Sequence, residues 1–301
     1  MAGRALPEGA DLTVEATAEA ITAVGGRGVP LPCDVGCDES LERALSMVGK
    51  AEGRLDVLVC SAYSTPPGKL RADFWTQGME TWDAVNGVGL RSVYAACSLA
   101  TPALIETAKS SPAGAPPPLI VLVSSFGGKS YTFNVAYGVG KAAIDRLAVD
   151  MSYQLKDFGV ATTALYPGLV ATEANLEMVK RGTWDEASGG LDLLADGETP
   201  AFSGRAVAKL ASLDAEAMLL RSGQVEVVAE MAKEFGFTEV DGSLPTSIRS
   251  LKYLLPNFVF PQVERESGKP VPDWVRNNVP DVLLPWSVFS SGPPPKPADE
   301  Q

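Results

Sequence analysis

Short runs of continuous apolar residues alternate along the chain with segments of helical spacing, and this alternation limits the folds open to it. Each run is five or six residues long and rich in Val, Leu and Ile. Such runs are typical of strands that are buried on both faces of a parallel sheet. Alternating strands and helices predict an α/β fold with a doubly wound sheet. The predicted strands are Gly28–Pro32, Leu55–Cys60, Leu119–Ser124, Ala161–Tyr166 and Gly223–Val228.

The segments between these runs carry apolar residues at helical spacing. Two stretches interrupt the pattern. Residues 110–118 are rich in proline and predict an exposed loop. Thr172–Phe202 has no clear period and predicts a long loop, of the kind that often serves as a lid or binding loop. The predicted helices are Leu12–Val24, Leu41–Lys50, Trp82–Lys109, Tyr137–Phe158 and Gly204–Leu213.

We expect residues 1–242 to form the α/β domain. Residues 243–289 contain many Leu, Pro, Phe and Trp residues, which favours a helical extension that packs on this domain. Contact of this extension with a membrane surface or a partner is the alternative. Residues 290–301 are rich in proline and polar side chains, and they predict a disordered tail.

The 301-residue chain contains no histidine and has a formal net charge of −12. Without histidine there can be no Ser-His-Asp triad, no Cys-His nucleophile and no His-ligated metal. Proton transfer must therefore rest on Asp, Glu, Tyr, Lys or Cys. The acidic composition argues against nucleic acid as the main partner, because phosphate binding needs a basic surface.

The four cysteines are Cys33, Cys37, Cys60 and Cys97, and they form no CxxC pair. This pattern indicates reduced thiols rather than a disulfide framework, and it predicts no metal site. No apolar run approaches the length of about 20 residues that a transmembrane helix needs. The amino terminus lacks the apolar core of a signal peptide. We expect an intracellular, cytoplasmic protein, with peripheral membrane association as the alternative.

One constellation carries chemistry. A predicted buried strand ends at Ser124, Tyr137 follows thirteen residues later, and Lys141 comes four residues after that. On a helix the last two side chains share one face. The carboxyl end of a strand in an open α/β sheet faces the ligand crevice, so Ser124 could meet both of them across a substrate. An ordinary surface pair on an amphipathic helix is the alternative for Tyr137 and Lys141.

This combination suits the interconversion of a carbonyl and an alcohol. A free tyrosine has a pKa near 10, which is too high for a base at neutral pH. A neighbouring ammonium is expected to lower the pKa of Tyr137, so that the phenol can exchange a proton with a substrate oxygen. The Ser124 hydroxyl could orient that oxygen, while a hydride comes from elsewhere.

The stretch resembles the short-chain dehydrogenase/reductase family, whose signature is a serine followed by Tyr-x-x-x-Lys, over roughly Gly3 to Gly242. The resemblance implies a Rossmann-like fold and hydride transfer on a small carbonyl or alcohol with NADP, or with NAD as the alternative. It implies that Tyr137 is the acid/base, that the Ser124 hydroxyl positions the substrate, and that Lys141 tunes Tyr137 and binds the nicotinamide ribose. One subgroup is most similar, through Gly53–Val59, Trp82-Asp83, Val88–Arg91, Phe133–Ala143 and Ser222–Val225.

Other segments resemble the cofactor-binding parts of that family. Asp34-Val35 looks like a pair that contacts adenine, although Asp34 could simply cap a turn. Pro167-Gly168 and Thr172 resemble a turn that holds the nicotinamide carboxamide, or they could form a plain loop. Arg4 resembles an arginine that faces a 2′-phosphate, or it is a solvated terminal residue. The implied cofactor-binding set is Arg4, Asp34, Val35, Ser61, Ala62, Tyr137, Lys141, Pro167, Gly168, Val170 and Thr172.

The sequence also departs from the family. The Thr-Gly-x-x-x-Gly-x-Gly motif that approaches the cofactor pyrophosphate does not occur. We therefore expect the sheet to lack its first strand-helix unit, either in an incomplete chain or in a cofactor-free descendant. Cys60-Ser61-Ala62-Tyr63 stands where the family has Asn-Asn-Ala-Gly. Gly89 aligns with the asparagine of the usual catalytic tetrad, and Asn86 lies one helical turn earlier.

Three functions fit these observations. The first is a nicotinamide-dependent oxidoreductase, with substrate choice set by Thr172–Phe202 and the carboxyl-terminal extension. The second is a non-catalytic scaffold that has lost cofactor binding. The third is an epimerase or dehydratase that uses the same Tyr-Lys pair. The resemblance also implies homo-oligomers that form through the helices near residues 82–109 and 137–158.

Overall fold

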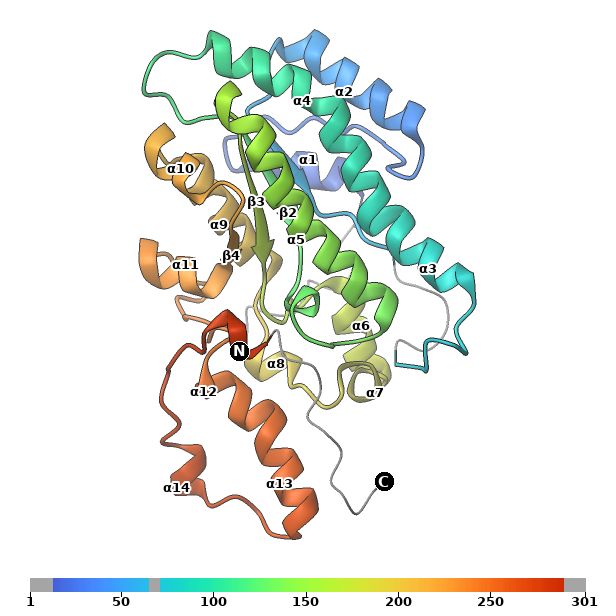
Figure 1. Cartoon of the computed structure of the whole chain (residues 1–301), viewed down its shortest axis with the longest axis vertical. Helices are drawn as coiled ribbons and strands as arrows, with labels where there is room; N and C mark the ends of the chain where they lie inside the picture. Colours follow the sequence, from blue (N-terminus) through green and yellow to red (C-terminus); the bar gives the residue numbers. More distant parts are fainter. Residues whose placement is uncertain (1–12, 65–70, 290–301) are drawn as a thin grey trace.

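The computed structural model describes residues 13–64 and 71–289, so the predicted Arg4 site and the predicted tail at 290–301 lie outside the described residues. Within them, four parallel strands form one sheet in the order β1-β2-β3-β4 (Figure 1). In register, Val57 lies beside Leu119, and Leu119 lies beside Ala161. The predicted α/β, Rossmann-like fold is confirmed. The strands are β1 (Val57–Cys60), β2 (Leu119–Val123), β3 (Ala161–Tyr166) and β4 (Val225–Val227).

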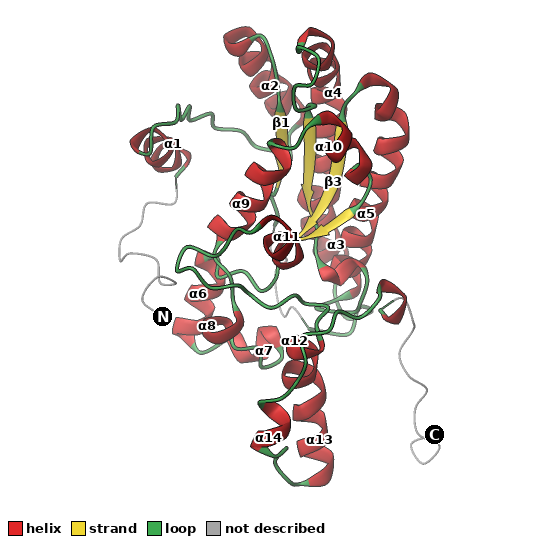
Figure 2. Cartoon of the chain, turned by 90° about the vertical axis from the view of Figure 1, so that its left-hand side faces the viewer, coloured by secondary structure: helices red, strands yellow, loops and turns green. Residues whose placement is uncertain are grey.

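Helices cover both faces of the sheet, as a doubly wound fold requires (Figure 2). Alternate residues of a strand point to opposite faces. Leu119 and Val121 belong to one buried cluster, whereas Ile120 and Leu122 belong to the other. The first cluster includes α9 (Pro200–Ala211), α10 (Ala215–Arg221) and α11 (Val228–Phe235). The second includes α4 (Ser92–Ser110), α5 (Val135–Leu155) and, at its margin, α2 (Asp38–Glu52).

A long helical segment crosses the second face. It consists of α3 (Met79–Asn86), the π-helical turn η1 (Gly87–Arg91) and α4, and it agrees with the predicted helix Trp82–Lys109. By length and composition alone, residues 79–110 could cross a membrane, and no other helix in the described ranges passes that test. Cys97 and Leu104 of this segment are fully buried against the sheet, which is how the core helix of a folded domain lies.

One predicted strand, Gly28–Pro32, is wrong. These residues adopt irregular backbone between α1 (Val14–Ala23) and α2. A strand forms only beside a partner. In the strand order 3-2-1-4-5-6 of a doubly wound fold the third strand pairs with the second, and the sheet of the described residues contains no strand in that place. Within residues 13–64 and 71–289, the outer edge of β1 is free and Val59 is 43% exposed. Figure 2 shows α1 standing apart from the sheet.

The predicted long loop at Thr172–Phe202 is also wrong, because most of it is helical. It folds into α6 (Glu173–Arg181), α7 (Trp184–Ser188) and α8 (Leu193–Asp196), followed by the start of α9. Trp184 and Leu193 are buried together with Ala171 and Leu176 in a small separate cluster. Helices of four to nine residues span too few turns to reveal an apolar period in the sequence.

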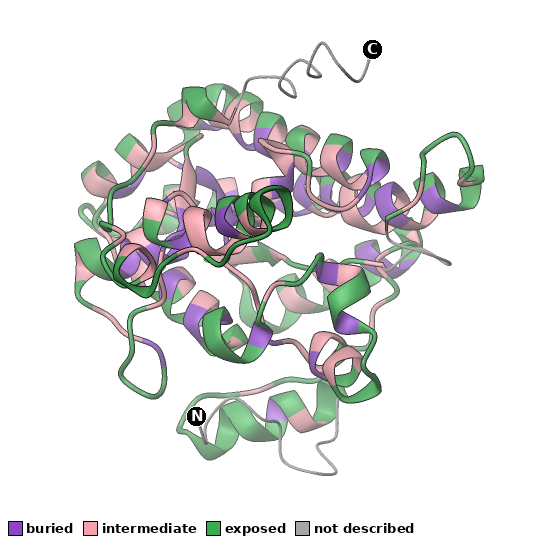
Figure 3. Cartoon of the chain, turned by 90° about the horizontal axis from the view of Figure 1, so that it is seen from below, coloured by how far each residue is buried: buried purple, intermediate pink, exposed green. Residues whose placement is uncertain are grey.

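The carboxyl-terminal residues contact the sheet where β3 and β4 end. Ile248, Tyr253 and Trp286 contact Tyr166 and Val227, while α13 and α14 extend away from the sheet (Figures 1 and 2). Buried residues gather towards the centre, and the outer helix faces are exposed (Figure 3). The remaining elements are η2 (Phe126–Gly128), η3 (Lys156–Phe158), α12 (Leu251–Leu254), η4 (Leu255–Val259), α13 (Phe260–Ser267), α14 (Asp273–Arg276) and η5 (Trp286–Val288).

Candidate active site

The start of α5 fixes the position of the tyrosine. Asn134 is the N-cap of this helix, and its side chain accepts a hydrogen bond from the backbone N–H of Tyr137 at 2.9 Å. This cap satisfies one of the free N–H groups of the first turn and defines where the helix begins. Tyr137 is therefore the third residue of α5, and Lys141 lies one turn further along the same face.

Tyr137 sits among aromatic rings and close to backbone. The Phe133 ring contacts it edge-on at a centroid distance of 5.1 Å, and the Tyr63 ring does so at 5.8 Å. Gly127 of η2 comes so close that a Cβ atom there would lie 2.5 Å from the Tyr137 ring. Only a glycine permits this approach, so the turn after β2 and the first turn of α5 enclose the phenol together.

Lys141 extends from α5 to the end of β2. Its Nζ donates a hydrogen bond to the Val123 carbonyl oxygen at 3.0 Å. The same nitrogen lies 5.5 Å from the Tyr63 ring centroid and 5.8 Å from that of Tyr137. Burial lowers the pKa of Lys141 to about 8, although the nearby Asp145 carboxylate opposes that shift. The structure thus brings Tyr137 and Lys141 together as the sequence predicted.

The pKa of Tyr137 does not follow the prediction. We expected a neighbouring ammonium to lower it, but burial of the phenol raises the pKa of Tyr137, and a hydrogen bond from the Ser125 hydroxyl only partly opposes this. Desolvation disfavours the charged phenolate more than its neighbours stabilise it. The Tyr137 phenol is therefore uncharged at neutral pH.

The serine prediction also needs correction. The Ser124 hydroxyl is buried and donates to Asp145 Oδ1 at 2.7 Å, with the Lys141 carbonyl oxygen at 3.2 Å. Ser125, rather than Ser124, supplies the hydroxyl next to Tyr137. Strand alternation explains this, because position 124 continues the row of Ile120 and Leu122 that faces α5. Which of the two serines faces Tyr137 depends on this alternation, and the spacing between Ser124 and Tyr137 in the sequence does not reveal it.

A buried polar cluster lies behind the site, and the sequence interpretation missed it. The carboxylate of Asp145 on α5 accepts hydrogen bonds from the hydroxyls of Tyr166 and Ser124, and Lys129 Nζ lies 3.7 Å away. Burial raises the pKa of Asp145 despite these partners. The cluster connects the ends of β2 and β3 to α5, so it holds the two strand ends in register with the helix.

The residues expected to hold the nicotinamide end lie beside the serines. Ser124 N donates to the Leu165 carbonyl oxygen at 2.9 Å, which places Pro167-Gly168 next to the end of β2. Thr172 is the N-cap of α6 and accepts from Asn175 N at 3.3 Å. Val170 pairs with Glu198 in an isolated parallel bridge. Thr172 and Val170 are therefore held by the start of α6 and by the bridge to Glu198.

The residues expected near adenine are more exposed than those expected near the nicotinamide. Asp34 is exposed, and its Oδ1 accepts from Gly36 N at 2.9 Å, which is the turn-capping alternative. Val35 lies in the same turn. Ser61 and Ala62 follow β1 and are exposed at the carboxyl edge of the sheet. These four residues carry no contact with Tyr137 or Lys141 among the interactions of the described chain.

A second missed residue is Glu198, which precedes α9. Its side chain is only 1% exposed and faces Gly168. In the described part of the chain, neither carboxyl oxygen has a well-formed hydrogen bond. Burial raises the pKa of Glu198 to about 8, which the backbone N–H of Gly168 only partly offsets. A neutral carboxyl group therefore borders the Pro167-Gly168 turn.

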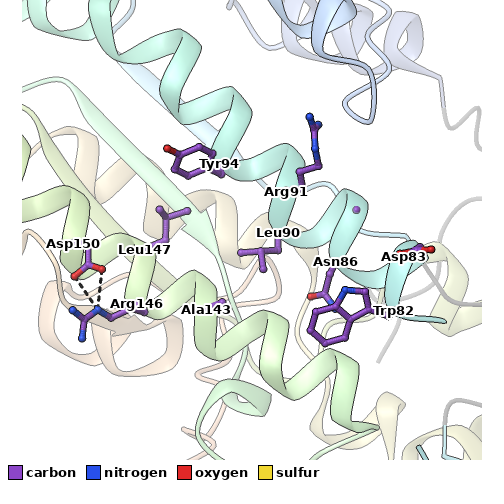
Figure 4. Close-up of a pocket in the computed structure, with 11 residues that line it drawn as sticks. Trp82, Asp83, Asn86, Leu90, Arg91, Tyr94, Ala143, Arg146, Leu147 and Asp150 are labelled. Atoms are coloured by element: carbon purple, nitrogen blue, oxygen red, sulfur yellow. Dashed lines mark hydrogen bonds and ion pairs between the residues drawn. The ribbon is translucent and has the colours of Figure 1, made fainter. Parts of the chain in front are cut away.

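One hollow in the described structure lies away from Tyr137, which is not among its lining residues. It is a groove of about 650 Å³ between the α3–α4 segment and α5 (Figure 4). Leu90 and Tyr94 come from one wall, and Leu147 and the Arg146–Asp150 ion pair come from the other. Its walls are the helices through which the sequence resemblance predicted homo-oligomers.

Comparisons with known proteins agree with this geometry. A family model described as enoyl-(acyl carrier protein) reductase matches residues 8–229. Dehydrogenase/reductase SDR family member 1 of Mus musculus is 38% identical over 250 residues, which cover 81% of this chain and 77% of that protein. Its Homo sapiens counterpart is 35% identical over the same shares.

A solved structure shows the same fold. The 3-oxoacyl-[acyl-carrier protein] reductase from Brucella melitensis in complex with NAD aligns with a TM-score of 0.61 and 20% identity, over 74% of this chain and 83% of that one. The subgroup that the sequence motifs indicated is the one to which the mouse and human relatives belong. On the family match, these two relatives and the site geometry, the chain belongs to the short-chain dehydrogenase/reductase family, whose members are generally NAD(P)-dependent oxidoreductases.

Proposed function

We propose that this oxidoreductase interconverts a small carbonyl compound and its alcohol, with Tyr137 as the acid/base. The observation that carries the proposal is that the Tyr137 phenol has the Ser125 hydroxyl as a hydrogen-bond partner, and that Lys141 Nζ lies 5.8 Å from the Tyr137 ring centroid. All three groups lie at the carboxyl edge of a parallel sheet, where ligands of such folds bind. Ser125 takes the orienting role that we had expected of Ser124.

The protonation states of Tyr137 and Lys141 favour a different role for each group in the reaction. In the reducing direction, the neutral Tyr137 phenol gives its proton to the substrate oxygen as a hydride reaches the carbonyl carbon. The Lys141 ammonium then stabilises the phenolate until a solvent proton replaces the one transferred. Ser125 holds the oxygen through a hydrogen bond. Oxidation of the alcohol uses the same groups in reverse.

We propose NADP as the cofactor, with NAD as the alternative. When bound, it accepts or donates the hydride. Lys141 would hold the nicotinamide ribose, while Pro167-Gly168 and Thr172 would hold the carboxamide. The residues fit this part of the cofactor, because the buried Glu198 carboxyl group beside Gly168 has no well-formed hydrogen bond within the described residues and only the Gly168 backbone N–H as a weak partner. The Brucella melitensis reductase binds NAD, which supports a nicotinamide cofactor.

We propose that α6–α8 and the carboxyl-terminal residues 243–289 select the substrate. Both segments lie at the carboxyl ends of β3 and β4, where Tyr253 and Trp286 reach Tyr166. Loops and short helices at this edge are where related folds vary their specificity. Self-association through the helices near 82–109 and 137–158 also remains a proposal, supported by the groove between them (Figure 4).

The test is titration of the purified chain with NADPH and NADH, followed by nucleotide fluorescence and thermal shift. We expect saturable binding, and turnover with simple ketones or aldehydes. Tyr137→Phe should keep nucleotide binding and lose turnover, because only the hydroxyl is removed. Tyr131→Phe is the matched control, since Tyr131 is 71% exposed. Absence of binding at millimolar nucleotide would overturn the proposal and favour the non-catalytic scaffold.

A further inference from the structure

Tyr63 occupies a place in the site that neither the motif nor the proposed mechanism uses. It follows β1, in the segment where the family has Asn-Asn-Ala-Gly and this chain has Cys60-Ser61-Ala62-Tyr63. Its ring meets the Tyr137 ring edge-on, with interplanar angle 90°. The Lys141 ammonium lies nearer to the Tyr63 ring centroid than to that of Tyr137. One ring thus touches both members of the Tyr-Lys pair.

Gly89 makes room for this ring. It lies in the π-helical turn η1, and a Cβ atom at this position would stand 3.4 Å from Cδ2 of Tyr63. A Cβ alone would be in ordinary contact, and the asparagine that the resemblance places here would add an amide group beyond that Cβ, beside the ring. Gly89 and Tyr63 are therefore complementary, since the small residue leaves the space that the large one fills.

The ring also faces a cation with few polar partners. Lys141 Nζ donates to the Val123 carbonyl oxygen and lies near the two rings, and the nearby Asp145 carboxylate also favours its charged form. The face of an aromatic ring is negative and attracts a buried ammonium. Burial raises the pKa of Tyr63, so its phenol stays neutral and acts through its ring rather than as a charge.

We propose that Tyr63 is a positioning residue of the active site. Its ring holds Tyr137 in place and favours the charged form of Lys141, in the space that Gly89 leaves open. The importance of this arrangement for turnover rests on the proposed function. The contact itself does not, so it can be tested without cofactor or substrate.

The test measures the pKa of Lys141 in the full chain from the pH dependence of amine acylation at this residue, followed by mass spectrometry. Tyr63→Leu should lower that pKa by about half a unit, a roughly threefold loss of proton affinity, because the ring face is removed. Tyr63→Phe keeps the ring and should restore the wild-type value. Tyr131→Leu removes an exposed ring that has no contact with the Lys141 ammonium among the interactions of the described residues, and it should leave the value unchanged.

Gly89→Asn probes the same contact from the other side. We expect it to displace the Tyr63 ring and to lower the Lys141 pKa as Tyr63→Leu does, and it replaces that variant if Tyr63→Leu does not fold. A second readout follows turnover: the pH profile of kcat should shift in Tyr63→Leu, while KM changes little. An unchanged Lys141 pKa in both variants would overturn the proposal. A shifted pKa in a chain without turnover would support Tyr63 and reject only the proposed function.

Discussion

The side chain of Asn134 accepts the backbone N–H of Tyr137, and this single hydrogen bond joins the start of α5 to the candidate acid/base. Asn134 is 1% exposed, so no solvent molecule can easily replace its oxygen. The first turn of α5 would fray without this cap, and Tyr137 lies in that turn. Loss of the cap should therefore affect stability and catalysis together.

Asn134→Ala is expected to lower the free energy of unfolding by about 1 kcal/mol, a typical value for loss of an N-cap. It should also reduce kcat, because the backbone N–H of Tyr137 loses the hydrogen bond that holds this residue in the first turn of α5. Asn134→Asp keeps an acceptor and should retain most of both. Chemical denaturation and steady-state kinetics on the three proteins provide the measurement. Loss of stability without any loss of kcat would contradict the positional role.

Substitution of the two neighbouring serines should have different effects, on catalysis for Ser125 and on stability for Ser124. Ser125→Ala is expected to lower kcat/KM by roughly 10²- to 10³-fold, the usual effect of removing a hydrogen-bond donor at a reacting oxygen. Ser124→Ala instead removes the partner of buried Asp145 and should cost about 1–3 kcal/mol of stability. Kinetics and thermal melting of both variants decide between them. The opposite pattern would return the catalytic role to Ser124.

Glu198 should make stability depend on pH. Its pKa is about 8 in the folded chain against 4.5 for the free side chain, so the folded state holds this proton more tightly. Its contribution is present in full below pH 4.5 and is lost as the pH rises to about 8, by roughly 1.4 kcal/mol per pH unit at the steepest point. Glu198→Gln should remove this slope. Denaturation curves between pH 5 and 9 would show it, and equal slopes in both proteins would contradict the assignment.

The groove in Figure 4 should mark a contact between copies of the chain. Tyr94 is 62% exposed on its α4 wall. Tyr94→Glu would place a charge there and should shift the protein from dimer or higher oligomer to monomer, as measured by light scattering after gel filtration. Tyr131→Glu, a change on another exposed tyrosine, should leave the mass unchanged. A monomeric wild-type chain would reject this interface.

The fold was largely accessible from the apolar runs. The strands that begin at Leu119 and Ala161 lie in the buried centre of the sheet. A strand buried on both faces is a continuous apolar run, so it can be recognised from its own residues alone. Gly28–Pro32 also contains apolar residues, but it includes two prolines that cannot donate to a ladder, and its state depends on whether a partner strand lies beside it. A run of sequence letters does not contain that information.

The site was accessible only in part. The spacing of Tyr137 and Lys141 expresses a local helical period, so the pair was found. The roles of Ser124 and Ser125 depend on which face of β2 points to α5, which is a tertiary property. The raised pKa of Tyr137 depends on burial by distant residues, including Gly127 and Tyr63, and the sequence pattern holds no measure of burial.

The free side of β1 has a consequence for how the sheet opens. Within residues 13–64 and 71–289, β1 is hydrogen-bonded to β2 alone, whereas β2 and β3 are bonded on both sides. Amide protons of a strand with one neighbour are released by smaller fluctuations than those of an enclosed strand. Deuterium should therefore enter β1 and β4, which each have one neighbour, before it reaches β2 and β3, so exchange is fast at the two edges of the sheet and slow at its centre.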